Sequence, residues 1–163
     1  MKRTYGFLPA AIVCLIMMCP ATPAAAGTIS VDINDPSCVS GSGQPDPYSV
    51  VYCAIEDAVA DSVNGDVVEV AAGIYIPAGN RLVIDRQITV TADPALGVSG
   101  PGPQLRPEII IDYFSYSNCG IQIAADNVIF DGFDVTGVYG SGRYLVGDYG
   151  GPVNNWIVRN CDI

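Results

Sequence analysis

Apolar and polar residues alternate along most of this chain with the two-residue period of β-strands, in short runs separated by turns rich in Gly and Pro. Each alternating run predicts one strand. The predicted strands are Thr28–Ile33, Asp66–Val70, Leu82–Ile84, Ile88–Val90, Ile109–Ile111, Ile121–Ile123, Val128–Phe130, Phe133–Val135 and Trp156–Val158. We expect Ala72–Tyr75 to be a turn and Gly137–Pro152 to be a long loop.

A single segment has helical spacing instead. Its apolar positions are Val51, Ala54, Ile55, Ala58, Val59 and Val63. Asp46 and Pro47 before it are typical of the N-cap and the first helical position, and Asn64-Gly65 after it is a stop signal. The pattern predicts one amphipathic helix between these signals.

The N-terminus has the three parts of a secretory signal peptide. Lys2 and Arg3 are followed by an apolar run from Phe7 to Cys19 and then by Ala24-Ala25-Ala26. The run is too short for a membrane span, which needs roughly 20 apolar residues. We expect residues 1–26 to be removed after Ala26, rather than kept as an anchor, and the protein to be secreted, periplasmic or displayed on the cell surface.

Composition narrows the chemistry of the remaining chain. Without Lys2 and Arg3 the formal net charge changes from −10 to −12, which disfavours binding to nucleic acid. The chain has no His, and its only Lys is in the leader. These absences exclude Ser-His-Asp catalysis, His-ligated zinc and lysine Schiff bases within this chain. No later segment is apolar for long enough to cross a membrane.

Four cysteines follow the leader, and an even number in an exported chain allows disulfides in three pairings. We favour Cys38 with Cys53, which would tie the first loop to the helix, and this leaves Cys119 with Cys161. The alternative is that these cysteines are buried free thiols.

A repeat is the most informative feature. Residues Asn127–Val135 match Asn155–Ile163 at a spacing of 28, and a looser copy lies at Leu82–Val90. In each copy alternate residues point inward, and Gly132 and Asn160 share a turn position that tolerates positive φ. Repeats of this kind bury their apolar faces only by stacking, about 4.8 Å apart.

These residues resemble the right-handed parallel β-helix repeat of the pectin lyase-like superfamily. The stretch from Cys53 to Tyr75, with its "AI..A…GD.V.V..G.Y" pattern, resembles the start of such proteins. The resemblance implies an all-β solenoid: an N-terminal cap of strand, loop and helix over residues 27–65, then β-helix coils over residues 66–163. Because the chain stops inside a repeat, we expect these coils to be incomplete.

Candidate chemistry lies on the outward positions of the repeat. Asp134 and Asp162 are equivalent and close enough to bind calcium or a sugar, or else to form part of a solvated acidic surface. Asp131 and Arg159 are also equivalent. Polysaccharide lyases of this family use an Arg as the base, so the resemblance implies that Arg159 is a candidate for that role. The alternative is a surface ion pair between Arg159 and Asp131.

Three further aromatic residues, Tyr139, Tyr144 and Tyr149, lie in the long loop, where they would either stack on sugar rings or pack the loop. The resemblance therefore implies an exported protein that contacts polysaccharide or a cell-surface glycan, as the N-terminal part of a lyase or hydrolase. The alternative is a non-catalytic structural or adhesin module.

Overall fold

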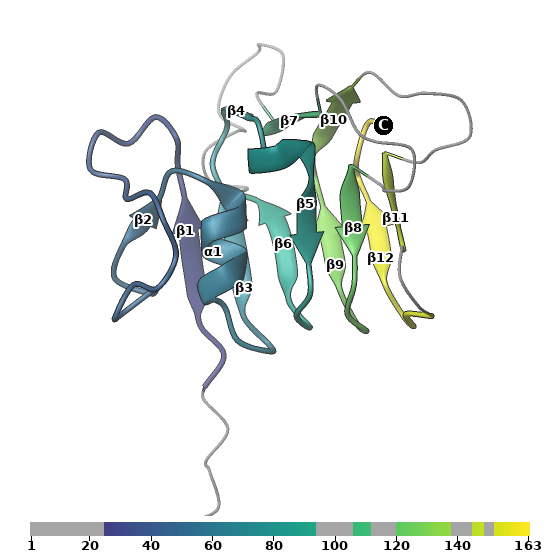
Figure 1. The fold of residues 1–163 in the computed structure, drawn as a ribbon, viewed down its shortest axis with the longest axis horizontal. Helices are drawn as coiled ribbons and strands as arrows, with labels where there is room; N and C mark the ends of the chain where they lie inside the picture. The colour runs from purple at the N-terminus through teal and green to yellow at the C-terminus, as the bar shows by residue number, and fades with distance from the viewer. Residues whose placement is uncertain (1–24, 94–105, 112–119, 138–144, 149–151) are drawn as a thin grey trace, which may run out of the picture.

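Parallel sheets dominate the protein. The computed structural model describes residues 25–93, 106–111, 120–137, 145–148 and 152–163 (Figure 1). Within these ranges α1 (Ile55–Asp61) is the only α-helix, and η1 (Ala78–Asn80) is a single 3₁₀ turn. The described chain is all-β with one short helix, as its alternating sequence predicts. Most of the predicted leader, residues 1–24, lies outside the described residues.

Three sheets hold the strands, and all pairings between the named strands are parallel. The first sheet has the order β12-β9-β6-β3-β1-β2, with bounds Ile157–Arg159, Ile129–Asp131, Thr89–Ala92, Val67–Val70, Thr28–Val31 and Val51–Tyr52. The second has the order β10-β7-β4, with bounds Asp134–Gly137, Glu108–Ile111 and Ile74–Tyr75. The third has the order β11-β8-β5, with bounds Val146–Asp148, Ile121–Ile123 and Leu82–Ile84.

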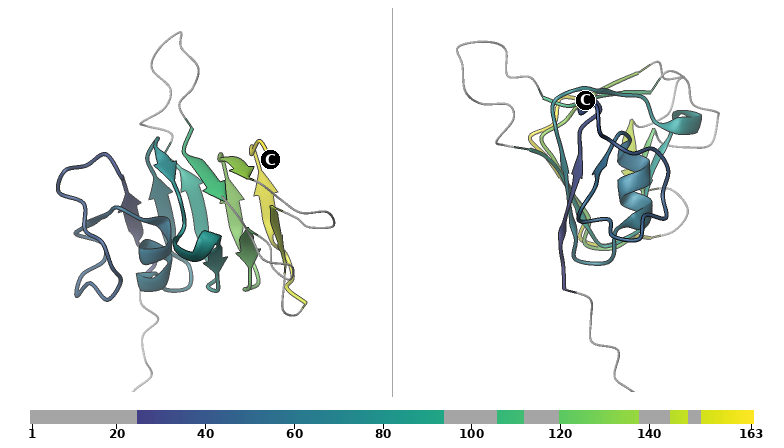
Figure 2. Two further views of the ribbon diagram at one scale, coloured as in Figure 1. Left: turned by 45° about the horizontal axis from the view of Figure 1, so that its top comes forward. Right: turned by 90° about the vertical axis from the view of Figure 1, so that its left-hand side faces the viewer.

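From β3 onward the chain visits the first, second and third sheets in turn and then repeats the sequence. Each strand therefore lies beside the strand that the chain formed in the same sheet on its previous visit, as the side-by-side arrows of Figure 1 show. Seen along the stack, the strands surround a common interior (Figure 2, right). We call one visit to the three sheets a pass.

The interior is filled by ladders of apolar side chains. In the first sheet Ile29, Val68, Val90 and Phe130 stack in register, and each is fully buried. Burial of one such side chain stabilises the fold by about 1.5–3 kcal/mol. Phe133 continues the core around the next corner, because its ring stacks on that of Phe130 with centroids 4.4 Å apart. The two-residue alternation of the sequence is thus what separates core from surface.

Helix α1 lies across the end of the stack formed by β1 and β3 (Figure 2, right). Its residues Ile55, Ala58 and Val59 are buried there, so the helix covers apolar core that the first strands would otherwise expose. Its predicted start near Pro47 is wrong. Asp46 instead accepts hydrogen bonds in a tight turn, and Val51–Tyr52 pairs with β1 as a strand.

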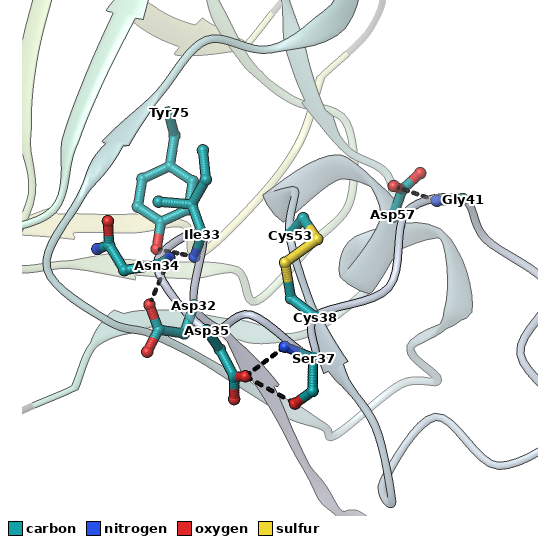
Figure 3. Close-up of a disulfide and its surroundings, with 10 residues drawn as sticks. All are labelled: Asp32, Ile33, Asn34, Asp35, Ser37, Cys38, Gly41, Cys53, Asp57 and Tyr75. Carbon is teal, nitrogen blue, oxygen red and sulfur yellow. Dashed lines mark hydrogen bonds between the residues drawn. A yellow bond between two sulfur atoms is a disulfide. The ribbon is translucent and has the colours of Figure 1, made fainter.

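The loop before the helix is fastened to it by a disulfide and by carboxylates (Figure 3). Cys38 and Cys53 are bonded, which confirms the favoured pairing. Asp57 of α1 accepts a hydrogen bond from the Gly41 amide at 2.7 Å, and Asp35 accepts two from Ser37. Part of the acidic composition therefore serves to satisfy loop amides.

The repeat at a spacing of 28 is confirmed, since Val158 pairs with Phe130 and both Gly132 and Asn160 have positive φ. The looser copy at Leu82–Val90 is wrong in register. The copy makes Leu82 equivalent to Val128, two expected coils later in the chain, but Leu82 pairs with Ile121 in the third sheet. The reason is that the passes differ in length: Val68, Val90, Phe130 and Val158 share one ladder at intervals of 22, 40 and 28 residues.

Besides β2, two short strands were not predicted. β4 lies where a turn was expected, and its Tyr75 points into the core while its hydroxyl donates to the Ala71 carbonyl. β11 lies inside the expected loop, where Gly147 and Asp148 break the apolar alternation that marks the other strands. Both strands are recognisable only by their pairing to β7 and β8.

Candidate functional site

Polar side chains gather on the outer surface where the first sheet turns into the second. We call this set the charged corner; its members are Arg106, Asp131, Asp134, Arg159, Asn160 and Asp162. Phe130 and Phe133 point inward from the same turn, so alternation directs Asp131 and Asp134 outward. The charged corner is thus a direct product of the repeat.

Asp131 and Arg159 form the first part of the charged corner. They are register partners in β9 and β12, and Arg159 Nε donates to Asp131 Oδ2 at 2.8 Å. The side-chain amide of Asn160 donates to Asp131 Oδ1 at 2.7 Å, so both carboxylate oxygens accept hydrogen bonds. Arg159 was predicted to be either a lyase base or the partner of Asp131 in an ion pair, and the structure contains the ion pair.

Asp134 and Asp162 form the second part. They pair in an isolated parallel bridge, as expected for equivalent positions of the repeat. Arg106 lies against both, with Nη1 3.6 Å from Asp134 Oδ1 and 3.8 Å from Asp162 Oδ2, and it donates to the Asn160 carbonyl. The guanidinium group of Arg106 therefore serves as the cation beside the carboxylates of Asp134 and Asp162.

A metal ion at this pair stays a prediction. Among the described residues there is no group of three or more carboxylate, thiol or imidazole side chains that could hold one. Calcium usually takes six or more oxygen ligands, so two carboxylates next to a guanidinium would leave most of its coordination to water or to a sugar.

The charged corner is partly open to solvent, since the side chain of Asp131 is only 16% exposed whereas others reach further out. The side chains of Arg159 and Asp162 are 56% and 88% exposed, and two guanidinium groups face three carboxylates. Ion pairs this exposed add at most about 1 kcal/mol to stability. Their groups are therefore available to exchange hydrogen bonds with a ligand, and together they offer both donors and acceptors.

Two groups of the N-terminal cap, Tyr52 and Asp61, have shifted pKa values. Burial and then the Asp61 carboxylate raise the pKa of Tyr52, whose hydroxyl donates to Asp61 at 2.7 Å. For Asp61, burial raises the pKa, but hydrogen bonds from Tyr52, Gly43 and Gln44 together lower it below the usual 3.8. These groups brace the loop that precedes α1 and are not part of the charged corner.

Several predicted residues are not placed. Tyr139, Tyr144, Tyr149 and Cys119 lie outside the described residues. Cys161 carries a free thiol, so the structure shows no disulfide from it to Cys119. Its sulfur lies 3.1 Å from the Arg159 carbonyl, in the turn that forms the charged corner. Cys161 is therefore a free thiol, as in the alternative, but it is half-buried and not buried as that alternative expected.

Two residues that were not predicted from the sequence make important contacts in the structure. Arg106 lies in a Pro-rich segment before β7, and only the pairing of β7 with β10 brings it to Asp134. Asp66 was expected as the first residue of a strand, but it is fully buried and binds three different parts of the cap. The signal in the sequence that could have identified Asp66 is its position, since it is a carboxylate directly before the buried strand β3.

Along the part of the chain that the structure describes, no helix has the length and apolar character needed to cross a membrane. Comparison of the chain with protein-family models, with curated proteins and with solved structures found no match.

Proposed function

We propose that this is an exported protein whose three parallel sheets form a right-handed β-helix of the pectin lyase-like kind, and that its charged corner binds polysaccharide. The leader pattern ending at Ala26 supports export. The disulfide between Cys38 and Cys53 is consistent with it, because disulfides persist mainly outside the cytoplasm.

The repeated passage through three sheets supports the β-helix. A connection between parallel strands of one sheet is right-handed in nearly all proteins, and every pass of this chain is such a connection. The in-register ladder from Ile29 to Phe130 supplies the continuous core that a stack of coils requires.

The observation that carries polysaccharide binding is the arrangement of Arg106, Asp131, Arg159 and Asn160 on adjacent passes, where Arg159 and Asn160 are exposed and Arg106 and Asp131 are partly buried. Guanidinium, carboxylate and amide groups offer donors and acceptors that suit the paired hydroxyls of a sugar. Stacked passes present these groups at the spacing of strands in a sheet, about 4.8 Å, along one direction. Such a row suits an extended polymer better than a compact small molecule.

Binding without turnover is the function that these residues support. Arg159 forms an ion pair with Asp131, and Arg106 forms ion pairs with Asp134 and Asp162. A lyase base must instead accept a proton from the sugar ring. A non-catalytic adhesin or structural module is the second candidate, supported by the same pairing.

The test is binding of the chain from Gly27 onward to immobilised pectin, alginate and a neutral glucan, each with and without calcium. Because the mature chain is strongly acidic, an acidic polymer has to be bound through Arg106, Arg159 or added calcium. We expect Arg159→Gln to weaken binding about tenfold. Arg86→Gln is the matched control, since Arg86 forms an ion pair with Asp85 at 2.8 Å outside the charged corner.

Binding to none of the three polymers, or equal losses in the two variants, would reject the charged corner as a polysaccharide site. Absorbance of unsaturated products should not rise during the incubation. A steady rise would show lyase turnover and would overturn the assignment of binding alone.

A further inference from the structure

Asp66 is a fully buried carboxylate at the base of the N-terminal cap. Its Oδ1 accepts a hydrogen bond from the Gly27 amide at 2.8 Å, and its Oδ2 accepts one from the Val63 amide at 2.8 Å. The Tyr48 hydroxyl donates to the same carboxylate at 3.2 Å. Asp66 thus joins β1, the loop before α1 and the turn after α1.

All three donors are neutral. Within the described residues, none of the ion pairs involves Asp66. A buried carboxylate without a cationic partner is costly, even when neutral groups donate hydrogen bonds to it. Among the residues that the structure describes, no cation forms an ion pair with this carboxylate.

Gly27 is also the residue that follows the predicted cleavage point. Hydrolysis of the Ala26–Gly27 peptide bond leaves a carboxylate on Ala26 and an ammonium group on Gly27 nitrogen. Ala25 and Ala26 are both exposed, while Gly27 is held in place because its carbonyl accepts from the Val67 amide at 2.9 Å. The new ammonium group would therefore form on an atom that already lies 2.8 Å from a buried carboxylate.

We propose that removal of the leader creates an ion pair between the Gly27 α-ammonium and Asp66, which locks β1 into the first sheet. The inference rests on the export proposed above. Before cleavage a neutral amide donates to the carboxylate at this place, and cleavage puts a positive charge on the same nitrogen, which adds the Coulomb attraction between opposite charges. The precursor is then less stable than the mature protein, which favours the unfolded state during export.

Glycine suits this position sterically. The ring of Tyr48 occupies the space that a side chain on residue 27 would need, so a larger residue would push the ring away from Asp66. The mature chain also contains no lysine, so the α-amino group of Gly27 is its only amine. The proposed lock can therefore be modified chemically without touching any other amine.

The experiment compares two forms of the chain that begins at Gly27, released from a fusion by a protease that leaves this glycine first. One form keeps the free amine; the other is acetylated, with hydroxylamine treatment to remove esters on Tyr and Cys. The acetyl group takes the place of the Ala26 carbonyl, so the acetylated form mimics the precursor. We expect acetylation to lower Tm at pH 7 by about 2–5 °C.

Asp66→Asn should abolish this difference between the free and acetylated forms. Asp57→Asn is the matched control, because Asp57 also accepts a loop amide but does not contact Gly27; it should lower both melting temperatures and preserve the difference. If Asp66→Asn does not fold, the difference in Tm between the free and acetylated native chains still tests the ion pair.

Equal melting temperatures for the free and acetylated native chains would overturn the lock whether or not the protein is exported. The mass of the exported protein tests the cleavage separately: a first residue other than Gly27 would overturn both the cleavage point and the lock. Neither result bears on polysaccharide binding, which is measured on the purified chain.

Discussion

Gly132→Ala should be among the most damaging single-methyl additions in this protein. Gly132 is the turn residue between Asp131 and Phe133, with φ of +90°, and a Cβ there would lie 2.9 Å from the Cβ of Ala92 in the preceding pass. A positive φ costs an L-residue about 1–2 kcal/mol, and overpacking adds about 1–3 kcal/mol. The expected total is about 2–5 kcal/mol, or roughly 6–15 °C in Tm.

The two contributions can be separated. Gly43 has a similar φ of +87°, but a Cβ there would meet nothing within 4 Å, so Gly43→Ala should lose only the conformational part. Ala92→Gly should reduce the cost of Gly132→Ala, because it removes the atom that the new methyl group meets. Urea unfolding of the variants, followed by far-UV circular dichroism and the fluorescence of Trp156, the single tryptophan, measures each cost.

If Gly132→Ala costs no more than Gly43→Ala, the contact between Gly132 and Ala92 adds no overpacking cost. This contact is also refuted if Ala92→Gly leaves the cost of Gly132→Ala unchanged, since the two passes would then not approach each other at this turn. Gly132→Ala should also weaken polysaccharide binding, because the same turn positions the carboxylates of the charged corner.

Two further predictions concern the N-terminal cap. Replacing both Cys38 and Cys53 by Ser should lower the free energy of unfolding by about 3 kcal/mol, which urea denaturation measures, because the bond closes a 15-residue separation; an unchanged midpoint would contradict this. Because the pKa of Asp61 is lowered by folding, its stabilisation is present above pH 3.8 and is lost as pH falls through the lower value. The Tm difference between native and Asp61→Asn should thus be full at pH 6 and shrink toward pH 2; a constant difference would contradict it.

Local features of this protein were predictable from its sequence. Alternation identified the inward residues Phe130, Phe133 and Val135, because successive side chains of a strand point to opposite faces whatever the strand pairs with. The spacing of 28 and the turn positions Gly132 and Asn160 were likewise readable, since two copies of one local structure share one pattern.

Other features depended on pairings between distant segments. Leu82 lies in the third sheet and not at the position equivalent to Val128, because passes of unequal length shift the register in a way that no single copy reveals. Val51–Tyr52 became a strand although its spacing suits a helix, since pairing with β1 satisfies its backbone.

The same division applies to the candidate sites. The sequence by itself identified Asp131, Asp134 and Asp162 as outward carboxylates, because orientation follows from the two-residue period. Only the tertiary structure brought Arg106 to two of them and the Gly27 amide to Asp66. Those contacts join residues that the chain separates widely, and the hydrogen-bonded register between passes, rather than any local preference, decides which of them meet.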